Sequence, residues 1–538
     1  MSSNRTISPI ILLLVTPFLV LLAACSSPQA PTSPAATQPD AATNDNADRI
    51  VTLLFTNDVE SAYDPIPAFW LDDIDMIGGI AEMTTLIETL RESEPNVFLF
   101  DSGDIFTGAL AKLTDGKLAF ELMITMGYDA MGIGNHEFEY GVGIFDWQKN
   151  RAPFPVLGAN FFYKDTDHPY AQAHTIIERD GVRIGVIGIM GQDAATAIIP
   201  SYIAPLDVTD PAEAVRKSVD ELRGQVDFIV LLTHQGKTAP MQTDAESDPR
   251  LQRDIDADIA LAGAVDGIDV LLAGHADAGT PEAVVHPATG TLIMQTYGQA
   301  THLGFLQLTL DASSGEIKSH DGKLIPVESS KLEPDPRILA KLNQYRDEHA
   351  VIMEKVGSTE APMIRRYIEE SDIGNLFADI FAAAGAADIG MVHGGSLRKD
   401  LPQGDIRLVD ILDSYPFVDP VNVKEMSGSQ IKRALEQSLT FERGMLQLSG
   451  LEMVYDLNQP KYSRVVSLKH NGQPVADDEM FTVAAPGFLT EGGDLYDSFP
   501  ESGVIRSVGK VSDVIIAHFQ SHESIPTPKR GRQWQLAE

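Results

Sequence analysis

The sequence predicts an α/β protein with two folded domains, and three observations support this prediction. The chain has 538 residues, which is too long for a single compact core. Short apolar runs, suited to strands buried on both faces of a sheet, recur through residues 49–332. A different set of motifs occupies residues 357–538. We therefore expect two domains with these bounds, joined by a linker helix over residues 333–356, where the composition is helical.

The N-terminus has the features of an export signal that ends in a lipidated cysteine. Arg5 precedes an apolar run from Ile10 to Leu22, which is too short and too interrupted for a membrane span. The run ends at Leu22-Ala23-Ala24-Cys25, which looks like a bacterial lipobox, and Cys25 is the only cysteine of the chain. Residues 1–25 are thus predicted to be a lipoprotein signal peptide with Cys25 lipidated. Ordinary cleavage beside an incidental cysteine is the alternative.

Two further features bear on location. Residues 26–48 are rich in Ala, Pro, Thr, Asn and Asp, and their lack of large apolar side chains predicts a disordered tether. Ser26 follows the cysteine, whereas an Asp there commonly signals retention in the inner membrane. We expect a protein anchored in the cell envelope by its lipid alone, facing the periplasm, with the outer membrane favoured, or facing the exterior.

The charge balance limits the partners that the surface can bind. The chain has 40 basic and 77 acidic side chains and a formal net charge of −37. A nucleic-acid polymer is therefore excluded as a partner, because phosphate backbones are bound by Lys and Arg. The same field repels small anions, so any anion site must be made positive locally by metal ions or arginines. A solvating surface without a specific partner is the simplest interpretation of the acidity.

Four apolar runs in the first domain predict buried strands, and metal-capable side chains follow each of them. The runs are Ile50–Phe55, Val97–Phe100, Val226–Leu232 and Ile268–Leu272. They are followed by Asn57-Asp58, Asp101-Ser-Gly-Asp104, Thr233-His234 and Ala273-Gly274-His275. Because α/β sheets place ligand sites in the loops beyond strand carboxyl ends, these side chains are expected to share one site.

Five motifs carry candidate metal ligands or catalytic groups. They are Asn57-Asp58-Val-Glu60, Gly103-Asp104, Gly134-Asn135-His136-Glu137, Thr233-His234-Gln235-Gly236 and Gly274-His275-Ala-Asp277. One such motif is weak evidence, since a histidine after a strand is more often structural. All five in this order resemble the calcineurin-type metallophosphoesterases, and in particular the bacterial family of 5′-nucleotidases, UDP-sugar hydrolases and 2′,3′-cyclic phosphodiesterases. The resemblance runs from about Ile50 to about Phe519. It implies a four-layer αββα sandwich followed by an α+β substrate-binding domain.

The resemblance implies two divalent metal ions bridged by Asp104. One ion would also take Asn135, His234 and His275, and the other would take Asp58, Glu60 and Asp277. At the second ion the family commonly has histidines where this chain has Glu60 and Asp277. We interpret both changes as a concerted change to an all-oxygen site, which suits Mg²⁺, Mn²⁺ or Ca²⁺. The site with two imidazoles could hold Mn²⁺, Fe²⁺ or Zn²⁺. The alternative is a degraded site that has lost one metal.

The resemblance also assigns a catalytic histidine. His136 resembles the residue that donates to the phosphoryl oxygen or the leaving group. The family orients this histidine with an Asp three residues later, and this chain has Glu139 there. Glu139 is expected to do the same through a longer side chain.

The second domain carries motifs that resemble a nucleoside clamp. Phe417, in Ser414-Tyr-Pro-Phe417, and Phe488, which begins the run to Asp494, would sandwich a nucleobase. Asp494 would accept hydrogen bonds from ribose hydroxyls, and Arg398 would contact the ribose or phosphate. If the flanking motifs were absent, both phenylalanines would be interpreted as core residues.

Two positions in the second domain depart from the family. His393 stands where the family often has Asn, and it is included among the substrate-binding residues. The upstream arginine of the family aligns with Tyr367, so Arg365 or Arg366 is expected to replace it, with Arg366 favoured.

The predicted function is hydrolysis of nucleoside 5′-phosphates to nucleoside and phosphate outside the cytoplasm. A 2′,3′-cyclic phosphodiesterase, a UDP-sugar hydrolase or a sulfur-compound hydrolase could use the same metals. A nucleotide-binding lipoprotein with a degraded metal site is the non-enzymatic alternative, but such a protein would have no need of His136.

Overall fold

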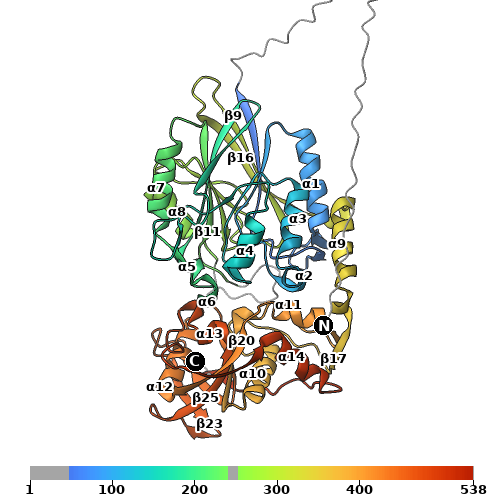
Figure 1. Cartoon of the computed structure of the whole chain (residues 1–538), viewed down its shortest axis with the longest axis vertical. Helices are drawn as coiled ribbons and strands as arrows, with labels where there is room; N and C mark the ends of the chain where they lie inside the picture. The colour runs from blue at the N-terminus through green and yellow to red at the C-terminus, as the bar shows by residue number, and fades with distance from the viewer. Residues whose placement is uncertain (1–47, 240–252, 537–538) are drawn as a thin grey trace, which may run out of the picture. The chain divides into compact units, whose positions relative to one another are not determined.

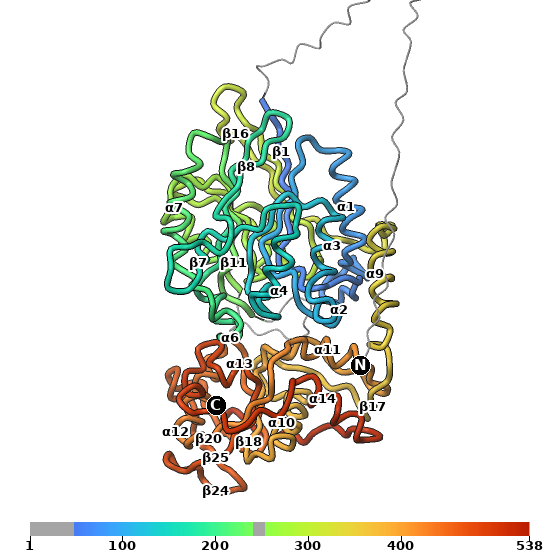
Figure 2. Tube along the Cα trace, in the orientation of Figure 1, coloured from blue at the N-terminus to red at the C-terminus, as the bar shows by residue number. Residues whose placement is uncertain are grey.

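The computed structural model describes residues 48–239 and 253–536 (Figure 1). The predicted signal peptide with Cys25 and nearly all of the predicted tether lie outside these residues. Within the described residues, no helix is both long and apolar enough to cross a membrane. Figure 2, coloured along the chain, shows that each of the two domains is formed by one run of sequence.

The first domain contains two six-stranded sheets. The first sheet has the order β16 (Ile317–Pro326), β15 (His302–Leu310), β1 (Arg49–Thr56), β4 (Val97–Asp101), β5 (Ala130–Gly132) and β6 (Val156–Leu157). The second has the order β13 (Val284–Val285), β14 (Leu292–Gln295), β12 (Val270–His275), β11 (Phe228–Gln235), β9 (Val182–Met190) and β8 (His174–Arg179). The strands that end at candidate ligands are parallel neighbours, β1 with β4 and β11 with β12, so their carboxyl ends meet at one edge of each sheet.

The two sheets pack face to face, and helices cover their outer faces (Figure 1). Alternate residues of β1 point to opposite faces of its sheet. Leu53 and Phe55 belong to the core between the two sheets, whereas Leu54 belongs to the core between the sheet and its helices. The helices over the first sheet are α1 (Ile80–Ser93), α2 (Gly108–Leu113), α3 (Lys117–Met126) and α4 (Val142–Lys149). Those over the second are α7 (Pro211–Leu222) and α8 (Asp256–Ala264). Burial on both faces explains the continuous apolar runs, and the predicted αββα architecture is confirmed.

Short elements complete this domain. They are β2 (Pro65–Pro67), β3 (Met76–Gly78), β7 (Phe161–Tyr163), β10 (Leu206–Val208), α5 (Gln192–Ala195), α6 (Pro200–Ile203), and the 3₁₀ turns η1 (His136–Phe138) and η2 (Ser329–Lys331).

A single helix, α9 (Pro336–Glu348), follows the first domain and is followed by the 3₁₀ turn η3 (Ala350–Met353). Asp335 starts α9, because its carboxylate accepts hydrogen bonds from the backbone N–H groups of Arg337 and Ile338. Pro336 occupies the first turn, where its missing N–H costs nothing.

The second domain is built on a five-stranded sheet. Its strands have the order β21 (Leu446–Ser449), β18 (Ile389–His393), β25 (Met480–Pro486), β20 (Pro420–Ser427) and β26 (Val504–Lys510). Two smaller sheets are formed by β17 (Lys355–Thr359) with β19 (Gly404–Arg407), and by β24 (Gln473–Pro474), β23 (Val465–His470), β22 (Leu451–Tyr455) and β27 (Gln533–Gln535). The helices are α10 (Asp372–Gly385), α11 (Leu408–Ser414), α12 (Gly428–Ser438), α13 (Gly487–Thr490) and α14 (Val511–Gln520), with the turns η4 (Gly394–Ser396) and η5 (Gly493–Leu495).

Two cores lie on opposite faces of the five-stranded sheet. Val392 belongs to the core that includes Phe377 of α10 and Phe519 of α14. Its neighbour Met391 belongs to the core that includes Ile431 of α12. This mixed sheet with helices on both faces is the α+β domain that the sequence predicted.

Candidate active site

One cavity collects most of the predicted site residues. Of the described residues, it is lined from the first domain by Asp58, Glu60, Asp104, Asn135, His136, Glu139, His275 and Asp277, among others. From the second domain it is lined by Tyr367, His393, Arg398, Phe417, Arg443, Phe488 and Asp494, among others. The cavity therefore joins the predicted metal cluster to the predicted nucleoside clamp.

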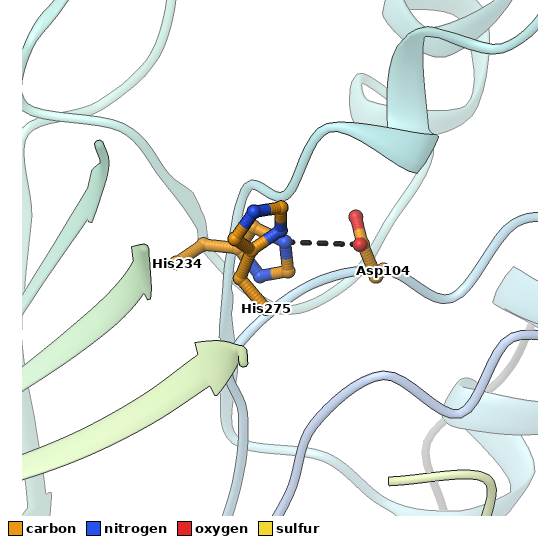
Figure 3. Close-up of side chains that lie close together, drawn as sticks. All are labelled: Asp104, His234 and His275. Carbon is orange, nitrogen blue, oxygen red and sulfur yellow. Dashed lines mark ion pairs between the residues drawn. The ribbon is translucent and has the colours of Figure 1, made fainter. Parts of the chain in front are cut away.

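Asp104, His234 and His275 form one potential metal group (Figure 3). Each offers a ligand atom, and these atoms lie within 4.8 Å of one another. His234 Nε2 lies 2.9 Å from Asp104 Oδ2 and 3.2 Å from Asn135 Oδ1. The other ring nitrogen, Nδ1, lies 2.8 Å from the Ser102 carbonyl oxygen. A neutral His234 that donates from Nδ1 to this carbonyl leaves Nε2 as a lone-pair ligand, as metal-binding histidines require.

Strand pairing places these histidines. β11 and β12 each continue three residues beyond the predicted apolar runs, so His234 and His275 lie within the strands. His234 pairs with Gly274, and Gln235 pairs with His275. Any side chain on Gly274 would collide with its surroundings, because a Cβ there would lie 2.9 Å from His234 Nδ1. The glycine thus lets the two imidazoles approach, with ring centroids 5.0 Å apart.

Asp58 and Asp277 form a second carboxylate pair, joined by Asn57. The Asn57 amide donates to Asp58 Oδ2 at 2.9 Å and to Asp277 Oδ1 at 3.4 Å. The Asn57 side-chain oxygen accepts hydrogen bonds from the N–H and hydroxyl of Thr296, which fixes the orientation of the amide. Burial raises the pKa of Asp58 to about 7 and raises the pKa of Asp277 well above its usual value. Neighbouring buried carboxylates of this kind fit a divalent cation, which would supply the missing positive charge.

Glu60 lies on the other side of Asp104, beside His136. Its Oε1 atom lies 3.2 Å from His136 Nε2 and 3.6 Å from Arg398 Nη1. Glu60, Asp104 and His136 form the second group whose ligand atoms lie within 4.8 Å of one another. The structure thus pairs Asp58 with Asp277, whereas Glu60 faces the predicted catalytic histidine.

The backbone is strained at five of the seven predicted ligands. Positive φ angles occur at Asp58 (48°), Glu60 (45°), Asp104 (62°), His275 (73°) and Asp277 (50°). Left-handed conformations are unfavourable for residues with a Cβ, least so for Asp and Asn, and strain of this kind concentrates at functional sites. The loops therefore hold these side chains in positions that unconstrained turns would not select.

Glu137 orients the Asp104 loop, a role that sequence reasoning did not assign. Its buried carboxylate accepts hydrogen bonds from the backbone N–H groups of Asp104 at 3.0 Å, Ile105 at 2.9 Å and Gly134 at 2.6 Å. Its place in the motif beside His136 was the available signal, but only the folded loops show which amides it binds.

The structure brings the predicted catalytic pair together. His136 Nδ1 forms a short hydrogen bond with Glu139 Oε1, and the same oxygen accepts a hydrogen bond from the Thr107 hydroxyl at 3.1 Å. Burial by itself would lower the pKa of His136, but Asp104, Glu139 and Glu60 raise it to about 9. His136 Nε2 lies 3.0 Å from Arg398 Nη2, on the side of the ring that faces Glu60. Catalytic function at this pair remains a prediction.

The two phenylalanines are half-buried in the cavity wall and do not lie within a core. Phe417 packs at the edge of one core of the second domain and Phe488 at the edge of the other. The Phe417 ring lies near Arg398, whose Cζ is 5.8 Å from the ring centroid. Phe488 lies beside His393, with ring centroids 5.9 Å apart.

Asp494 and His393 present buried polar atoms to the cavity. Among the described residues, Asp494 Oδ1 and His393 Nε2 have no hydrogen-bond partner. Burial raises the pKa of Asp494 to about 6, and burial with the charges of Arg443 and Arg398 lowers the pKa of His393 to about 3. Buried polar groups are nearly always satisfied, so these atoms indicate a polar ligand.

The substrate-binding role of Arg366 stays a prediction. Neither Arg365 nor Arg366 is among the described residues that line the cavity, whereas Tyr367 is. Among the contacts of this segment, the Arg365 backbone N–H donates to Asp400 at 2.7 Å, and its guanidinium donates to the Leu397 carbonyl at 3.2 Å. Arg443, which the sequence analysis did not select, lines the cavity instead.

Comparisons with known proteins decide the family. Residues 51–276 match the model of calcineurin-like phosphoesterases, and residues 355–501 match that of the 5′-nucleotidase C-terminal domain. The chain belongs to the 5′-nucleotidase family. The predictions of this family and of a metal-dependent phosphoester hydrolase are thereby confirmed.

Relatives within the 5′-nucleotidase family align over nearly the whole chain. The chain is 26% identical to a 5′-nucleotidase of Diplobatis ommata, over 89% of this chain and 88% of the relative. It is also 26% identical to a 5′-nucleotidase of Vibrio vulnificus, over 88% of this chain and 90% of the relative. A 5′-nucleotidase precursor from Thermus thermophilus shares the fold, with a TM-score of 0.78, 23% identity, and coverage of 91% of this chain and 100% of that chain.

Proposed function

We propose that this protein hydrolyses nucleoside 5′-phosphates to nucleoside and inorganic phosphate. The observation that carries this proposal is the single cavity, whose wall holds potential metal ligands, a His–Glu pair and two half-buried phenylalanines with an acidic partner. A phosphate bound near Asp104 would leave its nucleoside within reach of Phe417 and Phe488. The family match supports phosphoester chemistry, and the names of the relatives support a nucleotide.

Two divalent cations are proposed for this site. Asp104, Asn135, His234 and His275 would hold one, and the ligand atoms of Asp104, His234 and His275 lie within 4.8 Å of one another. Asp58, Glu60, Asp104 and Asp277, which all line the cavity, would hold the other. When bound, such ions neutralise the carboxylates, polarise the phosphoryl group and activate the attacking water. We propose Mg²⁺, Mn²⁺ or Ca²⁺ for the carboxylate set, because hard cations prefer oxygen ligands, and Mn²⁺, Fe²⁺ or Zn²⁺ for the set with imidazoles.

His136 would supply the proton for the leaving group. Water would attack phosphorus as the bond from phosphorus to the ester oxygen breaks, and His136 Nε2 would donate its proton to that oxygen. The proton that the attacking water loses would leave with the phosphate product to solvent, from which His136 is protonated again. Glu139 holds the ring through Nδ1, which keeps Nε2 directed toward the cavity. Arg398, 3.0 Å from the same Nε2, is placed to bind the phosphate beside it.

The nucleoside would bind through the second domain. Phe417 and Phe488 stack on the base, and Asp494 accepts hydrogen bonds from ribose hydroxyls with Oδ1, which has no hydrogen-bond partner within the described chain. His393, neutral at physiological pH, can donate or accept beside it.

We also propose that the reaction takes place outside the cytoplasm. The predicted lipobox at Cys25 and the tether over residues 26–48 support a protein held in the cell envelope by lipid, with the outer membrane favoured. The site would then act on nucleotides that reach the periplasm or the exterior.

Phosphate release by the soluble form that begins at Asp48 tests this function. AMP, UDP-glucose and 2′,3′-cyclic AMP are each assayed with Mg²⁺, Mn²⁺, Ca²⁺ or Zn²⁺. The proposal is supported if the unaltered protein hydrolyses AMP, the Asp104→Asn variant does not, and the control variant Asp220→Asn, changed at an exposed position, still does. Tight nucleoside binding without turnover of any substrate would refute it and leave a binding lipoprotein. Faster turnover of either of the other substrates would identify a sister activity.

A further inference from the structure

We infer that Arg443 is a second substrate-binding arginine of this site, which binds the phosphate end of the nucleotide from the side opposite Arg398. The inference rests on the proposed function, because it assigns a residue to the substrate of that reaction. It concerns a residue in the loop between α12 and β21 that carries none of the sequence motifs described above.

The position of Arg443 spans the two halves of the cavity. Its Nη1 atom lies 3.5 Å from His275 Nε2, at the predicted metal cluster. Its Nε atom lies 3.7 Å from Asp494 Oδ1, at the predicted ribose subsite. The group between a metal-bound phosphate and a ribose is the 5′-phosphoester itself. A guanidinium in this position faces the part of the substrate that carries the negative charge.

Arg398 reaches the same cavity from another direction. It lies 3.0 Å from His136 Nε2 and 3.6 Å from Glu60 Oε1, whereas Arg443 contacts His275. The two arginines therefore approach different ends of the metal cluster. A phosphate between them could accept hydrogen bonds from both, and arginine suits this task because its fork of N–H groups matches phosphate oxygens.

The contacts of Arg443 leave capacity for an anion. Its side chain is 22% exposed, and its nearest carboxylate in the described chain is Asp494 at 3.7 Å. The other contacts join Nη2 to the Asp193 carbonyl at 3.2 Å and Nη1 to the Thr238 hydroxyl at 3.4 Å. Charge-assisted hydrogen bonds of arginine are shorter, about 2.7–2.9 Å. A largely buried guanidinium with such long contacts has lost water without gaining a close counter-charge, which a substrate phosphate would provide.

Backbone packing explains how this loop reaches the site. Gly444, with φ of 95°, packs against the loop that leads to Arg398: a Cβ on Gly444 would lie 2.9 Å from the Gly395 nitrogen. The next residue, Met445, donates its N–H to the Tyr367 carbonyl at 2.7 Å. Arg443 thus enters the cavity beside Tyr367, the position where the family resemblance led us to expect an arginine. Its guanidinium compensates locally for the tyrosine.

The test compares ligands with and without a phosphate. Calorimetric titration of the metal-loaded protein with adenosine and with a non-hydrolysable phosphonate analogue of AMP is performed for the unaltered protein, Arg443→Ala, Arg443→Gln and Arg443→Lys. Loss of one charged hydrogen-bonding group is expected to weaken the analogue about 10- to 100-fold. Adenosine affinity is expected to stay within about threefold, and Arg443→Lys is expected to lie between the unaltered protein and Arg443→Ala.

The matched control is Arg433→Ala, which removes an exposed arginine of α12 that pairs with Glu501. It is expected to leave both affinities unchanged, and melting temperatures verify that each variant is folded. If Arg443→Ala does not fold, Arg443→Gln, which keeps most of the side chain, carries the test. Steady-state assays add a second readout, a larger rise in KM for AMP than fall in kcat.

Three results would overturn the inference. Equal weakening of adenosine and the analogue would place Arg443 at the ribose through Asp494. No change in either affinity would exclude a binding role. If the unaltered protein binds neither ligand, the proposed function itself is rejected, and the inference about Arg443 is rejected with it. This result differs from the other two, in which the unaltered protein binds both ligands.

Discussion

The carboxylate of Asp419 accepts a hydrogen bond from the backbone N–H of Phe488 at 2.9 Å. The same buried carboxylate accepts a hydrogen bond from the Tyr415 hydroxyl at 3.2 Å. Phe417 lies between Tyr415 and Asp419 in the chain, so one side chain joins the segments that carry both predicted base-stacking residues. The spacing of the two phenylalanines therefore depends on Asp419.

Asp419→Ala should loosen this clamp without damaging the phosphate site. Removal of the carboxylate leaves the Phe488 N–H without its acceptor, at a cost of about 1–3 kcal/mol. We expect KM for AMP to rise about 10-fold, a change of about 1.4 kcal/mol in substrate binding. Hydrolysis of p-nitrophenyl phosphate, which lacks a base, should change little. The exposed Asp478→Ala is the control, and an equal loss with both substrates would show that Asp419 supports the whole domain.

The phenylalanines themselves should act on affinity for the base. Stacking is worth about 1–3 kcal/mol per base, so Phe417→Ala or Phe488→Ala should raise KM for AMP roughly 5- to 150-fold. Kinetics are measured with AMP, which has a base, and with ribose 5-phosphate, which has none. A loss of stacking should raise KM for AMP alone, whereas general damage to the site should affect both substrates. Phe69→Ala, at a position that is 62% exposed, should have no effect. Unchanged KM for AMP in both cavity variants would exclude the predicted clamp.

Glu139→Gln should shift the alkaline limb of the pH profile of kcat/KM to lower pH. In the proposed mechanism His136 acts in its protonated form, which is present below its pKa, and Glu139 is one of the carboxylates that raise that pKa to about 9. Loss of the negative charge of Glu139 lowers the pKa of His136, so the protonated form of His136 is lost at a lower pH. We expect kcat/KM to fall about 10- to 100-fold at neutral pH, which is less than the roughly 100- to 10,000-fold that general acid catalysis supplies in full, because His136 itself is retained.

Two further variants test this assignment. Glu139→Asp keeps the negative charge and should shift the alkaline limb of the pH profile less than Glu139→Gln does. Glu178→Gln, at an exposed position, should not shift it. An unchanged profile in Glu139→Gln would mean that the limb belongs to another group.

The carboxylates at positions 60 and 277 should set metal preference. In the double variant Glu60→His/Asp277→His, two imidazoles replace hard oxygen ligands, and zinc should be favoured over magnesium or calcium. Metal content after dialysis against an equimolar mixture of ions provides the measurement, and phosphate release with each ion provides a second. We expect the ratio of bound zinc to magnesium to rise at least about 10-fold. The same ratio in both proteins would argue that neither side chain binds metal.

The sequence by itself was enough to predict the architecture, and it supplied most of the candidate residues that the structure collects in one cavity. Buried strands require apolar residues on both faces, so Ile50–Phe55 and its counterparts were visible as runs, and the polar groups after them could be assigned to one edge. His136 and Glu139 were predicted as partners from the family resemblance, and the structure places His136 Nδ1 within hydrogen-bonding distance of Glu139 Oε1.

Only the tertiary structure decided which side chains from distant segments meet in the cavity. Arg443 is among the described residues that line the cavity, whereas Arg365 and Arg366 are not; Arg365 contacts Leu397 and Asp400, and Gly444 packs on Gly395. Asp419 reaches the Phe488 amide across 69 positions of sequence. Such contacts depend on the three-dimensional packing of segments that are far apart in the sequence. The spacing of apolar and polar residues along the chain does not specify that packing. Sequence patterns therefore specified the strands and their polar ends, and packing between loops specified which arginine side chains line the cavity.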